Sequence, residues 1–208
     1  MIVYQSNKAH FLDDAFKRDI EVVILAEFTA RTGHRVAESE VRSWKESLLS
    51  VAKVLNDDDI PQDSGVAIEY NIPQTGKRID FMLSGRNAQQ LDHLIIIELK
   101  QWSTLKMTDK DAIVAVRFAA GEAEVSHPSY QAWTYASLLE NFNEAVYEGG
   151  IHLFPCAYLH NYVADGVITH AFYRDHIDRA PVFLKGDVER RKLRNSSRNT
   201  SSMAIGPT

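Results

Sequence analysis

Four aliphatic residues in a row, Leu94 to Ile97, are followed at once by Glu98, Leu99 and Lys100. A short run of this kind predicts a strand that is buried on both faces. A buried strand that ends in a carboxylate and an ammonium is unfavourable, because each charge loses its hydration unless it is paired or coordinated. The chain therefore has to fold so that this strand ends at a site that stabilises both charges.

The segments on either side of this strand predict a mixed β-sheet flanked by helices. Apolar residues recur at helical spacing in three segments: 9–32, 38–56 and 126–146. Alternation or a continuous apolar run predicts strands in four segments: 65–73, 77–83, 93–101 and 151–162. Residues 103–125 show neither pattern and are interpreted as loop or short helix. The order α, α, β, β, β, α, β places the protein in the mixed α/β (α+β) class.

Turn and cap residues mark several boundaries of these elements. Gly76 suits a hairpin turn between the first two strands, and Pro155 indicates a bulge in the last one. Ser126 or His127 is predicted to cap the third helix ahead of Pro128. Binding of a phosphate is the alternative role for His127.

The 208 residues fit one domain, which we expect to span 1–188. The remaining stretch, 189–208, has five basic residues followed by Ser, Asn and Thr, and little to bury. This composition predicts a disordered tail, and a chain cut from a longer protein. Its basic residues are interpreted as solvated rather than as phosphate ligands.

Composition excludes several classes of protein. A net charge of −5 argues against a protein that coats DNA by its overall field. The single cysteine, Cys156, excludes an internal disulfide and a cysteine-rich zinc site, and suits a reducing cytoplasm. The start of the sequence lacks the features of a signal peptide, and no apolar run is long enough to span a membrane. We therefore expect a cytoplasmic protein without a membrane partner.

Strand geometry places the charged residues on predictable faces. Side chains alternate along a strand, so Glu98 and Lys100 share one face, about 6.6 Å apart along the strand axis. Asp80 lies in the middle of the preceding strand and reaches the same face beside Glu98 if the two strands pair. Glu69, on the first strand, is either a further acid near this pair or a solvated charge.

Two clustered carboxylates raise each other's proton affinity unless a cation lies between them. Oxygen ligands select Mg²⁺ or Mn²⁺, for which Asp80, Glu98 and the backbone carbonyl of Leu99 are the candidate ligands. Lys100 is then placed to activate a water or to stabilise charge on a phosphate. This set of groups fits metal-assisted hydrolysis of a phosphodiester bond, with a structural ion pair as the alternative.

Asp80 and the later Glu98-Leu99-Lys100 resemble the motif of the PD-(D/E)xK nucleases, although Ile79 replaces the usual proline before the aspartate. The resemblance implies a restriction-endonuclease-like αβββαβ core, onto which residues 37–162 can be aligned. It also implies that Asp80, Glu98 and Lys100 are catalytic and that the metal is Mg²⁺ or Mn²⁺.

Gln131 and Tyr135 form a Q-x-x-x-Y pair that is similar to the motif of the RecB-like and Cas4-like members. A spacing of four residues places both side chains on one face of a helix. The resemblance implies that this pair lies beside the metal site and contacts nucleic acid.

Residues 1–188 resemble more narrowly the nuclease-like domain that precedes a Schlafen-type superfamily 1 helicase domain in bacterial proteins. The resembling stretches include VAIEYNIPQTGKRIDF, IIIELKQW and CAYLHNY, and the chain has no G-x-x-x-x-G-K-[ST] loop of its own. The resemblance implies a DNA nuclease that acts with a helicase domain or partner, in phage defence or DNA repair. RNA as substrate and a homo-oligomer stay open. The alternative is a catalytically silent nucleic-acid-binding or regulatory module that positions a partner helicase.

Overall fold

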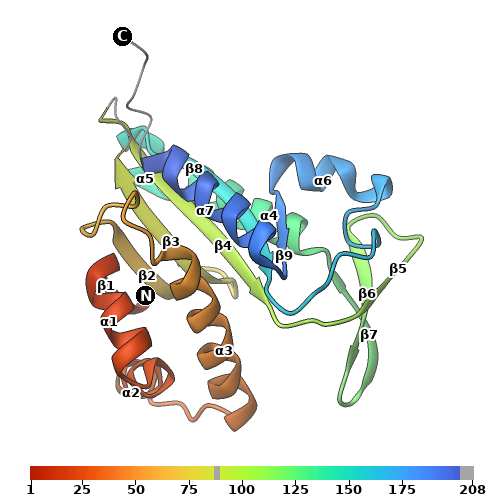
Figure 1. Cartoon of the computed structure of the whole chain (residues 1–208), viewed down its shortest axis with the longest axis horizontal. Coiled ribbons are helices and arrows are strands. Elements are labelled where there is room, and N and C mark those ends of the chain that lie inside the picture. Colours follow the sequence, from red (N-terminus) through yellow and green to blue (C-terminus); the bar gives the residue numbers. More distant parts are fainter. Residues whose placement is uncertain (87–89, 202–208) are drawn as a thin grey trace.

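A computed structural model describes residues 1–86 and 90–201, which form two β-sheets and the helices around them (Figure 1). The large sheet has the strand order β1-β2-β3-β4-β8-β9, and the small sheet has the order β5-β6-β7. The mixed α/β class predicted from the sequence is confirmed. The elements, in chain order, are β1 Ile2–Asn7, α1 Lys8–Lys17, α2 Ile20–Thr32, α3 Glu38–Leu55, β2 Gly65–Asn71, β3 Arg78–Arg86, β4 Asp92–Lys100, β5 Leu105–Met107, β6 Ile113–Phe118, β7 Gly121–Ser126, α4 Pro128–Phe142, α5 Glu144–Gly149, β8 His152–Leu159, the 3-10 turn Ala171–Tyr173, α6 Arg174–Arg179, β9 Val182–Leu184 and α7 Asp187–Ser201.

Strands β1 to β4 pair antiparallel, whereas β4, β8 and β9 run parallel. The predicted pairing of β3 with β4 is present, with Phe81 opposite Ile97. The small sheet and α4 form the connection from β4 to its parallel neighbour β8, as a parallel pair requires. Pairing of β8 with β4 continues through Pro155 without a bulge. Since β9 pairs only with the end of β8, Pro155 lies where β8 has no second neighbour.

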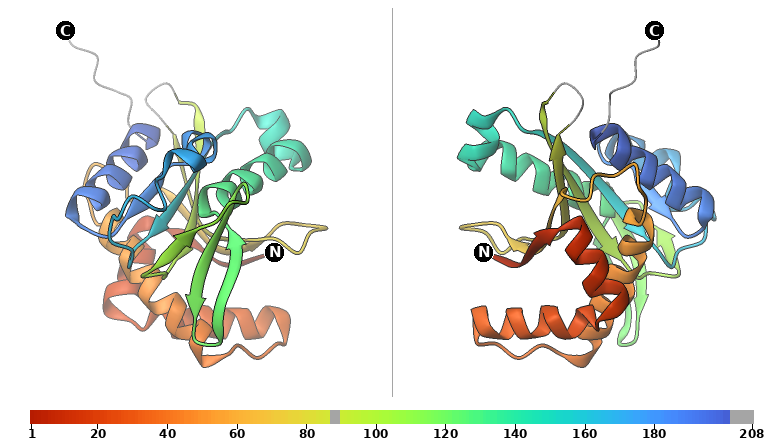
Figure 2. Two further views of the ribbon diagram at one scale, coloured as in Figure 1. Left: turned by 90° about the vertical axis from the view of Figure 1, so that its right-hand side faces the viewer. Right: turned by 60° about the vertical axis from the view of Figure 1, so that its left-hand side comes forward.

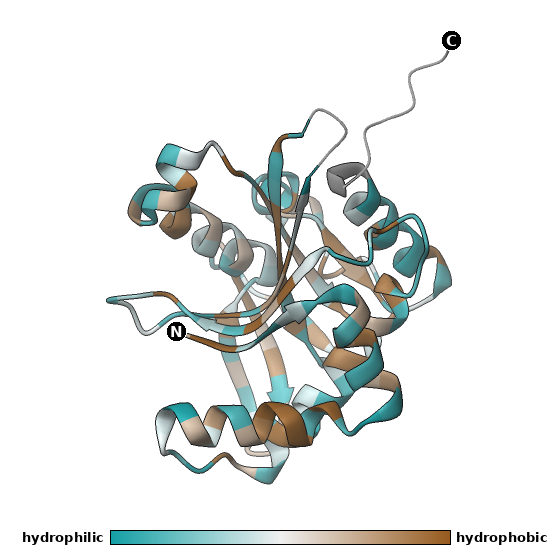
Figure 3. Cartoon of the chain, turned by 90° about the vertical axis from the view of Figure 1, so that its left-hand side faces the viewer, coloured by the Kyte–Doolittle hydropathy of each residue, from teal (hydrophilic) through white to brown (hydrophobic). Residues whose placement is uncertain are grey.

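Helices cover both faces of the large sheet (Figure 2). On one face α1, α2, α3 and α7 bury a core that includes Phe11, Leu48, Phe81 and Ile97. On the other face α4 packs its Tyr135 and Leu139 against β3 and β4. This two-sided burial explains the continuous apolar run in β4. Figure 3 shows the same division, with hydrophobic strands inside and a largely hydrophilic α7 outside.

Three segments differ from the sequence-based predictions. The helix predicted over 9–32 is two helices, because the backbone at Arg18 is extended and turns the chain between α1 and α2. Residues 103–125 contain β5 to β7 instead of loop or short helix. The first strand, β1, was not predicted. Its sequence pattern is too short to predict a strand, and pairing with β2 at the edge of the sheet stabilises it as one.

The prediction of a disordered tail over 189–208 is wrong for the part that the structure describes. Residues 187–201 form α7, and residues 202–208 lie outside the described part of the chain. Leu193 of α7 is fully buried in the main core, and Arg198 forms a bidentate ion pair with Asp57, with Nε donating to Oδ1 at 3.0 Å and Nη2 to Oδ2 at 2.7 Å. These contacts order a segment whose composition alone favours disorder. None of the described helices combines the length and the apolar character needed to cross a bilayer.

His127 caps α4, as predicted. Its Nδ1 accepts a hydrogen bond from the backbone N–H of Ser129 at 3.2 Å, and its Nε2 donates to the carbonyl of Ile168 at 3.0 Å. The side chain is fully buried, and burial lowers the pKa of His127 to about 4, so the ring is neutral. Both ring nitrogens are therefore engaged, which leaves none for a phosphate.

The cap can be tested by substitution. We expect His127→Ala to lower the free energy of unfolding by about 1–3 kcal/mol, because the helix loses its cap and a buried carbonyl loses its donor. His127→Asn retains a capping oxygen and should lose less. Urea denaturation followed by circular dichroism measures both. Equal stability of all three proteins would contradict the structural role of His127.

Candidate active site

The acidic residues of the site lie where β3 begins and β4 ends. Phe81 and Ile97 form the last regular pair of the two strands. Asp80 and Glu98 occupy the next position beyond this pair, Asp80 on β3 and Glu98 on β4. The Asp80 carboxylate accepts a hydrogen bond from the backbone N–H of Leu99 at 2.8 Å. The Asp80 side chain thus replaces the backbone hydrogen bond that would come next between β3 and β4. Because the N–H and C=O of one strand residue point the same way, the Leu99 carbonyl faces the same side as this contact.

Lys100 contacts the carboxylate of Glu98 directly. The Glu98 side chain is 2 % exposed and the Lys100 side chain 18 % exposed, so the amine reaches the edge of the site. Burial alone would lower the pKa of Lys100, but the charges of Glu98 and Asp80 outweigh it and raise the pKa. The ammonium also lies 5.4 Å from the centre of the Trp102 ring. Lys100 is therefore held as a cation beside two acids.

The two carboxyl groups interact unfavourably when both are ionised. Burial raises the pKa of Asp80, and burial together with the Asp80 charge raises the pKa of Glu98. The groups are close enough for a hydrogen bond between them once one is protonated. The Glu98 Oε2 atom is buried and receives no hydrogen bond from any described donor. One lysine does not neutralise this pair, so the site favours either a shared proton or a further cation.

Glu69 extends the acidic cluster across β2. The pairs Ile68–Phe81 and Tyr70–Ile79 flank it, so Glu69 lies opposite Asp80 in the register. It is only 3 % exposed, which excludes the solvated alternative. Burial raises the pKa of Glu69 to about 7, and the Asp80 charge adds to this rise.

The backbone at Glu69 is left-handed, with a φ of 56°. For a residue with a side chain this conformation costs about 1–2 kcal/mol, and such strain is concentrated at functional sites. Two contacts hold it: Trp44 Nε1 donates to Glu69 at 2.9 Å, and Arg78 Nε lies 2.6 Å from its second oxygen. The bend therefore places a third acid beside Asp80 together with its own cation.

Gln131 and Tyr135 approach the acids from α4, which covers the face of the sheet to which Ile96 and, two residues later, Glu98 project. Gln131 Nε2 donates to the Tyr135 hydroxyl at 2.7 Å, as their spacing of four residues allows. Tyr135 is buried, and its pKa is raised by burial first and by the charge of Glu98 second. Tyr135 therefore lies within electrostatic reach of Glu98, whereas Gln131 is only partly buried.

A pocket of about 90 Å³ opens on the α3 side of the cluster, lined by residues that include Ser43, Trp44, Ser47, Glu69, Arg78 and Asp80. This volume holds about three water molecules. Ser47 Oγ lies 3.0 Å from His160 Nε2, and Gln101 Nε2 donates to the Ser43 carbonyl at 2.8 Å. Sequence analysis missed the two serines and Arg78. Their only signal was a pair of small polar residues, four apart, beside the apolar stripe of α3.

The acids of the site could bind Mg²⁺ or Mn²⁺ with few protein ligands and several waters. Within residues 1–86 and 90–201, no three His, Cys, Asp or Glu side chains converge as a ready metal cage. Mg²⁺ does not need one, because it typically binds one or two carboxylates and keeps several waters. Asp80, which lines the pocket with room for water, and Glu98, with its unsatisfied Oε2, supply this donor set. The Leu99 carbonyl can add a third oxygen.

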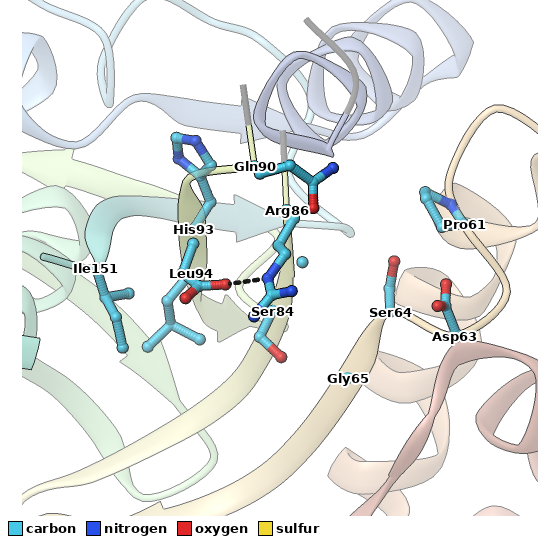
Figure 4. Close-up of a pocket in the computed structure, with 12 residues that line it drawn as sticks. Pro61, Asp63, Ser64, Gly65, Ser84, Arg86, Gln90, His93, Leu94 and Ile151 are labelled. Atoms are coloured by element: carbon cyan, nitrogen blue, oxygen red, sulfur yellow. Dashed lines mark hydrogen bonds and ion pairs between the residues drawn. The ribbon is translucent and has the colours of Figure 1, made fainter. Parts of the chain in front are cut away.

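A larger cavity, of about 730 Å³, lies at the other end of β4 (Figure 4). Arg86 and Asp92 line it and neutralise each other in an ion pair of 2.8 Å. His93 and Ser64 are further lining residues. Six residues of strand separate Asp92 from Glu98, or roughly 20 Å. Among the described lining residues the acids are Asp63 and Asp92, and Asp92 is paired with Arg86, so the size of this cavity does not make it the better candidate for chemistry.

Comparison with known proteins adds no relative: no protein-family model matches the chain, and no curated protein and no solved structure matches it either. What the site does must therefore be inferred from its own chemistry.

Proposed function

We propose that this protein is a metal-dependent nuclease that hydrolyses phosphodiester bonds of DNA. One observation carries the proposal: Glu98 is buried at the end of a core strand, the partly buried Asp80 lies beside it, and Lys100 contacts Glu98 directly. With Glu69 and its partner Arg78 included, three acids face two cations, so the cluster carries more negative charge than a balanced set of ion pairs. Such an imbalance in a buried site favours a cation that the protein binds for its chemistry.

The roles follow from the geometry. Asp80 and Glu98 would hold Mg²⁺ or Mn²⁺, which when bound supplies Lewis-acid polarisation of a phosphate and a more acidic water. Lys100, already cationic and partly exposed, orients the attacking water and stabilises the charge that develops on the phosphate. Glu69 holds Arg78 beside Asp80. Gln131 and Tyr135 flank the acids from α4 and would position the substrate.

The resemblance to PD-(D/E)xK nucleases supports the same proposal. The order α3, β2, β3, β4, α4, β8 contains the expected αβββαβ core, with β5 to β7 and α5 inserted. Asp80 and the E-x-K triplet lie together where β3 begins and β4 ends, and Tyr135 of the Q-x-x-x-Y pair is within electrostatic reach of both acids. By the same resemblance, we propose that the nuclease works with a helicase domain or partner in phage defence or DNA repair.

The first test is direct. Purified protein with Mn²⁺ or Mg²⁺ should cleave a plasmid or a labelled single strand, and EDTA should stop the reaction. The rate on RNA of the same sequence, compared with the rate on DNA, shows which nucleic acid is the preferred substrate. Binding of oligonucleotides without product, in either metal and on every substrate, would instead support a silent module that positions a partner helicase.

A further inference from the structure

We propose that a groove between α3 and α7 binds the phosphodiester backbone of the substrate and leads it to the acidic site. This inference rests on the proposed function and names the surface by which that site reaches its substrate. The groove has a volume of about 410 Å³ and is lined by Lys53, Asp187, Arg190, Arg191 and Arg194. Four cations therefore face it with a single carboxylate.

Two of these cations are available for a ligand. Arg190 pairs with Asp187, and Arg194 lies 3.4 Å from Asp57 and also donates to the carbonyls of Lys53 and Val54. Lys53 and Arg191, by contrast, are exposed and form no ion pair with any carboxylate in the described chain. A protein with a net charge of −5 has thus gathered unneutralised positive charge in one groove.

Strand topology places the start of α7 on the side of the sheet where the strands carrying the acids also begin or end. Lys100, Leu159 and Leu184 lie in one row across the parallel strands β4, β8 and β9. Two strand spacings separate the ends of this row, or about 10 Å. Helix α7 begins at Asp187, three residues after Leu184, beside the end of β9 (Figure 1).

Side chains between the groove and the pocket beside Asp80 interact with one another. Burial raises the pKa of Tyr158, and the positive charge of Arg190, which lines the groove, partly offsets the rise. The Tyr158 ring packs against that of His160, with 6.0 Å between their centres. His160 in turn contacts Ser47, which lines the 90 Å³ pocket. Groove and pocket also share helix α3 and lie on the same face of the sheet.

The chemistry of the groove favours a phosphate backbone over other ligands. Exposed Lys and Arg side chains without fixed partners bind regularly spaced phosphates and release the counterions of the nucleic acid. The described lining residues include no aromatic side chain on which a base could stack, and the groove is dominated by cations, so we expect it to position the strand through its phosphates. The one carboxylate, on Asp187, is already paired with Arg190.

The test is a binding titration of labelled single-stranded and duplex DNA in EDTA, over a range of salt concentrations. The double variant Lys53→Ala/Arg191→Ala should bind about tenfold more weakly than wild type and lower the salt slope by roughly 1.8 on duplex. The charge control, Lys17→Ala/Arg31→Ala, removes two cations from α1 and α2 that pair with Asp13 and Glu27 and do not line the groove. It should bind as wild type does. All three proteins should have the same melting temperature.

The outcomes separate this inference from the proposed catalysis. Unchanged affinity and salt slope in the groove variant overturn the groove, even if the wild type cleaves DNA. Equal losses in the groove variant and the control also overturn it, because they indicate only overall charge. A selective loss in the groove variant supports the groove, and it does so even if no protein cleaves, a result that would overturn the catalytic proposal alone.

Discussion

Replacing Glu98 by glutamine should lower the rate of DNA cleavage on the order of 10³-fold or more, while the protein remains folded. Glutamine keeps the shape of the side chain but removes one of the two charges that would hold the metal. Since Glu98 is buried and its pKa is already raised, the substitution also removes an unfavourable buried charge. We therefore expect the metal-free variant to melt at or above the temperature of the wild type. Steady-state cleavage rates and thermal melts measure the two effects.

Glu124→Gln is the matched control, because Glu124 is an exposed glutamate of β7 that pairs with Lys110. It should cleave as fast as wild type and melt at nearly the same temperature, since exposed ion pairs contribute little. Asp80→Asn should lose as much activity as Glu98→Gln. Full activity in either active-site variant would contradict the assigned role of these acids. A melting temperature far below that of the wild type would show that the ion pair with Lys100 is structural.

Addition of Mg²⁺ or Mn²⁺ should stabilise the protein, and the stabilisation should grow as the pH rises from about 5 to 8. The folded-state pKa values of Asp80 and Glu98 lie above their unfolded values of about 3.9 and 4.3. Their contribution to stability is therefore fully present below the unfolded pKa values and is lost as the pH rises through the folded ones. Glu69, with its pKa raised to about 7, contributes with the same sign. A divalent cation competes with the bound proton and restores what the metal-free protein loses.

The size of this effect follows from mass action. At a metal concentration one hundred times the dissociation constant, binding stabilises the folded state by about 2.7 kcal/mol. For a chain of this length that corresponds to a rise of roughly 5–10 °C in the melting temperature. Differential scanning fluorimetry at pH 5.5 and pH 8, with and without metal, measures the rise. The double variant Asp80→Asn/Glu98→Gln serves as the control and should show no metal-dependent shift.

Two results would contradict the predicted metal site. A shift of the same size at both pH values would mean that the metal does not compete with protons on these carboxyl groups. A shift that persists in the double variant would mean that the metal binds elsewhere. Either result leaves the fold as described and removes the chemical basis of the nuclease proposal.

Local pattern was enough to predict the part of the fold that carries the acids. The apolar run before Glu98 and the alternation around Asp80 predicted β3, β4 and their pairing, which the structure contains. The four-residue spacing of Gln131 and Tyr135 likewise predicted that they share a helix face. These features follow from the repeat of a strand or a helix, which depends only on neighbouring residues. The fold class and the gathering of charged residues were therefore accessible from the sequence.

Other features depended on contacts between residues far apart in the chain. The small sheet exists because β5, β6 and β7 pair with one another and bury Leu105 and Val114, although their own pattern is weak. The bend at Glu69 depends on Trp44 and Arg78, and neither neighbours it in sequence. No local rule indicates which distant partner will offset the strain of a left-handed glutamate.

The sequence by itself determined that a core strand ends in a carboxylate and an amine, because burial and alternation are set by neighbouring residues. Only the tertiary structure decided that α7 is an ordered helix. Its composition favours a solvated tail, yet Arg198 reaches Asp57, 141 positions away, and Leu193 joins the main core. The free energy of such long-range contacts depends on which partner the fold brings near, and a local pattern does not contain that information. Folding therefore turned a basic tail into one wall of the groove between α3 and α7.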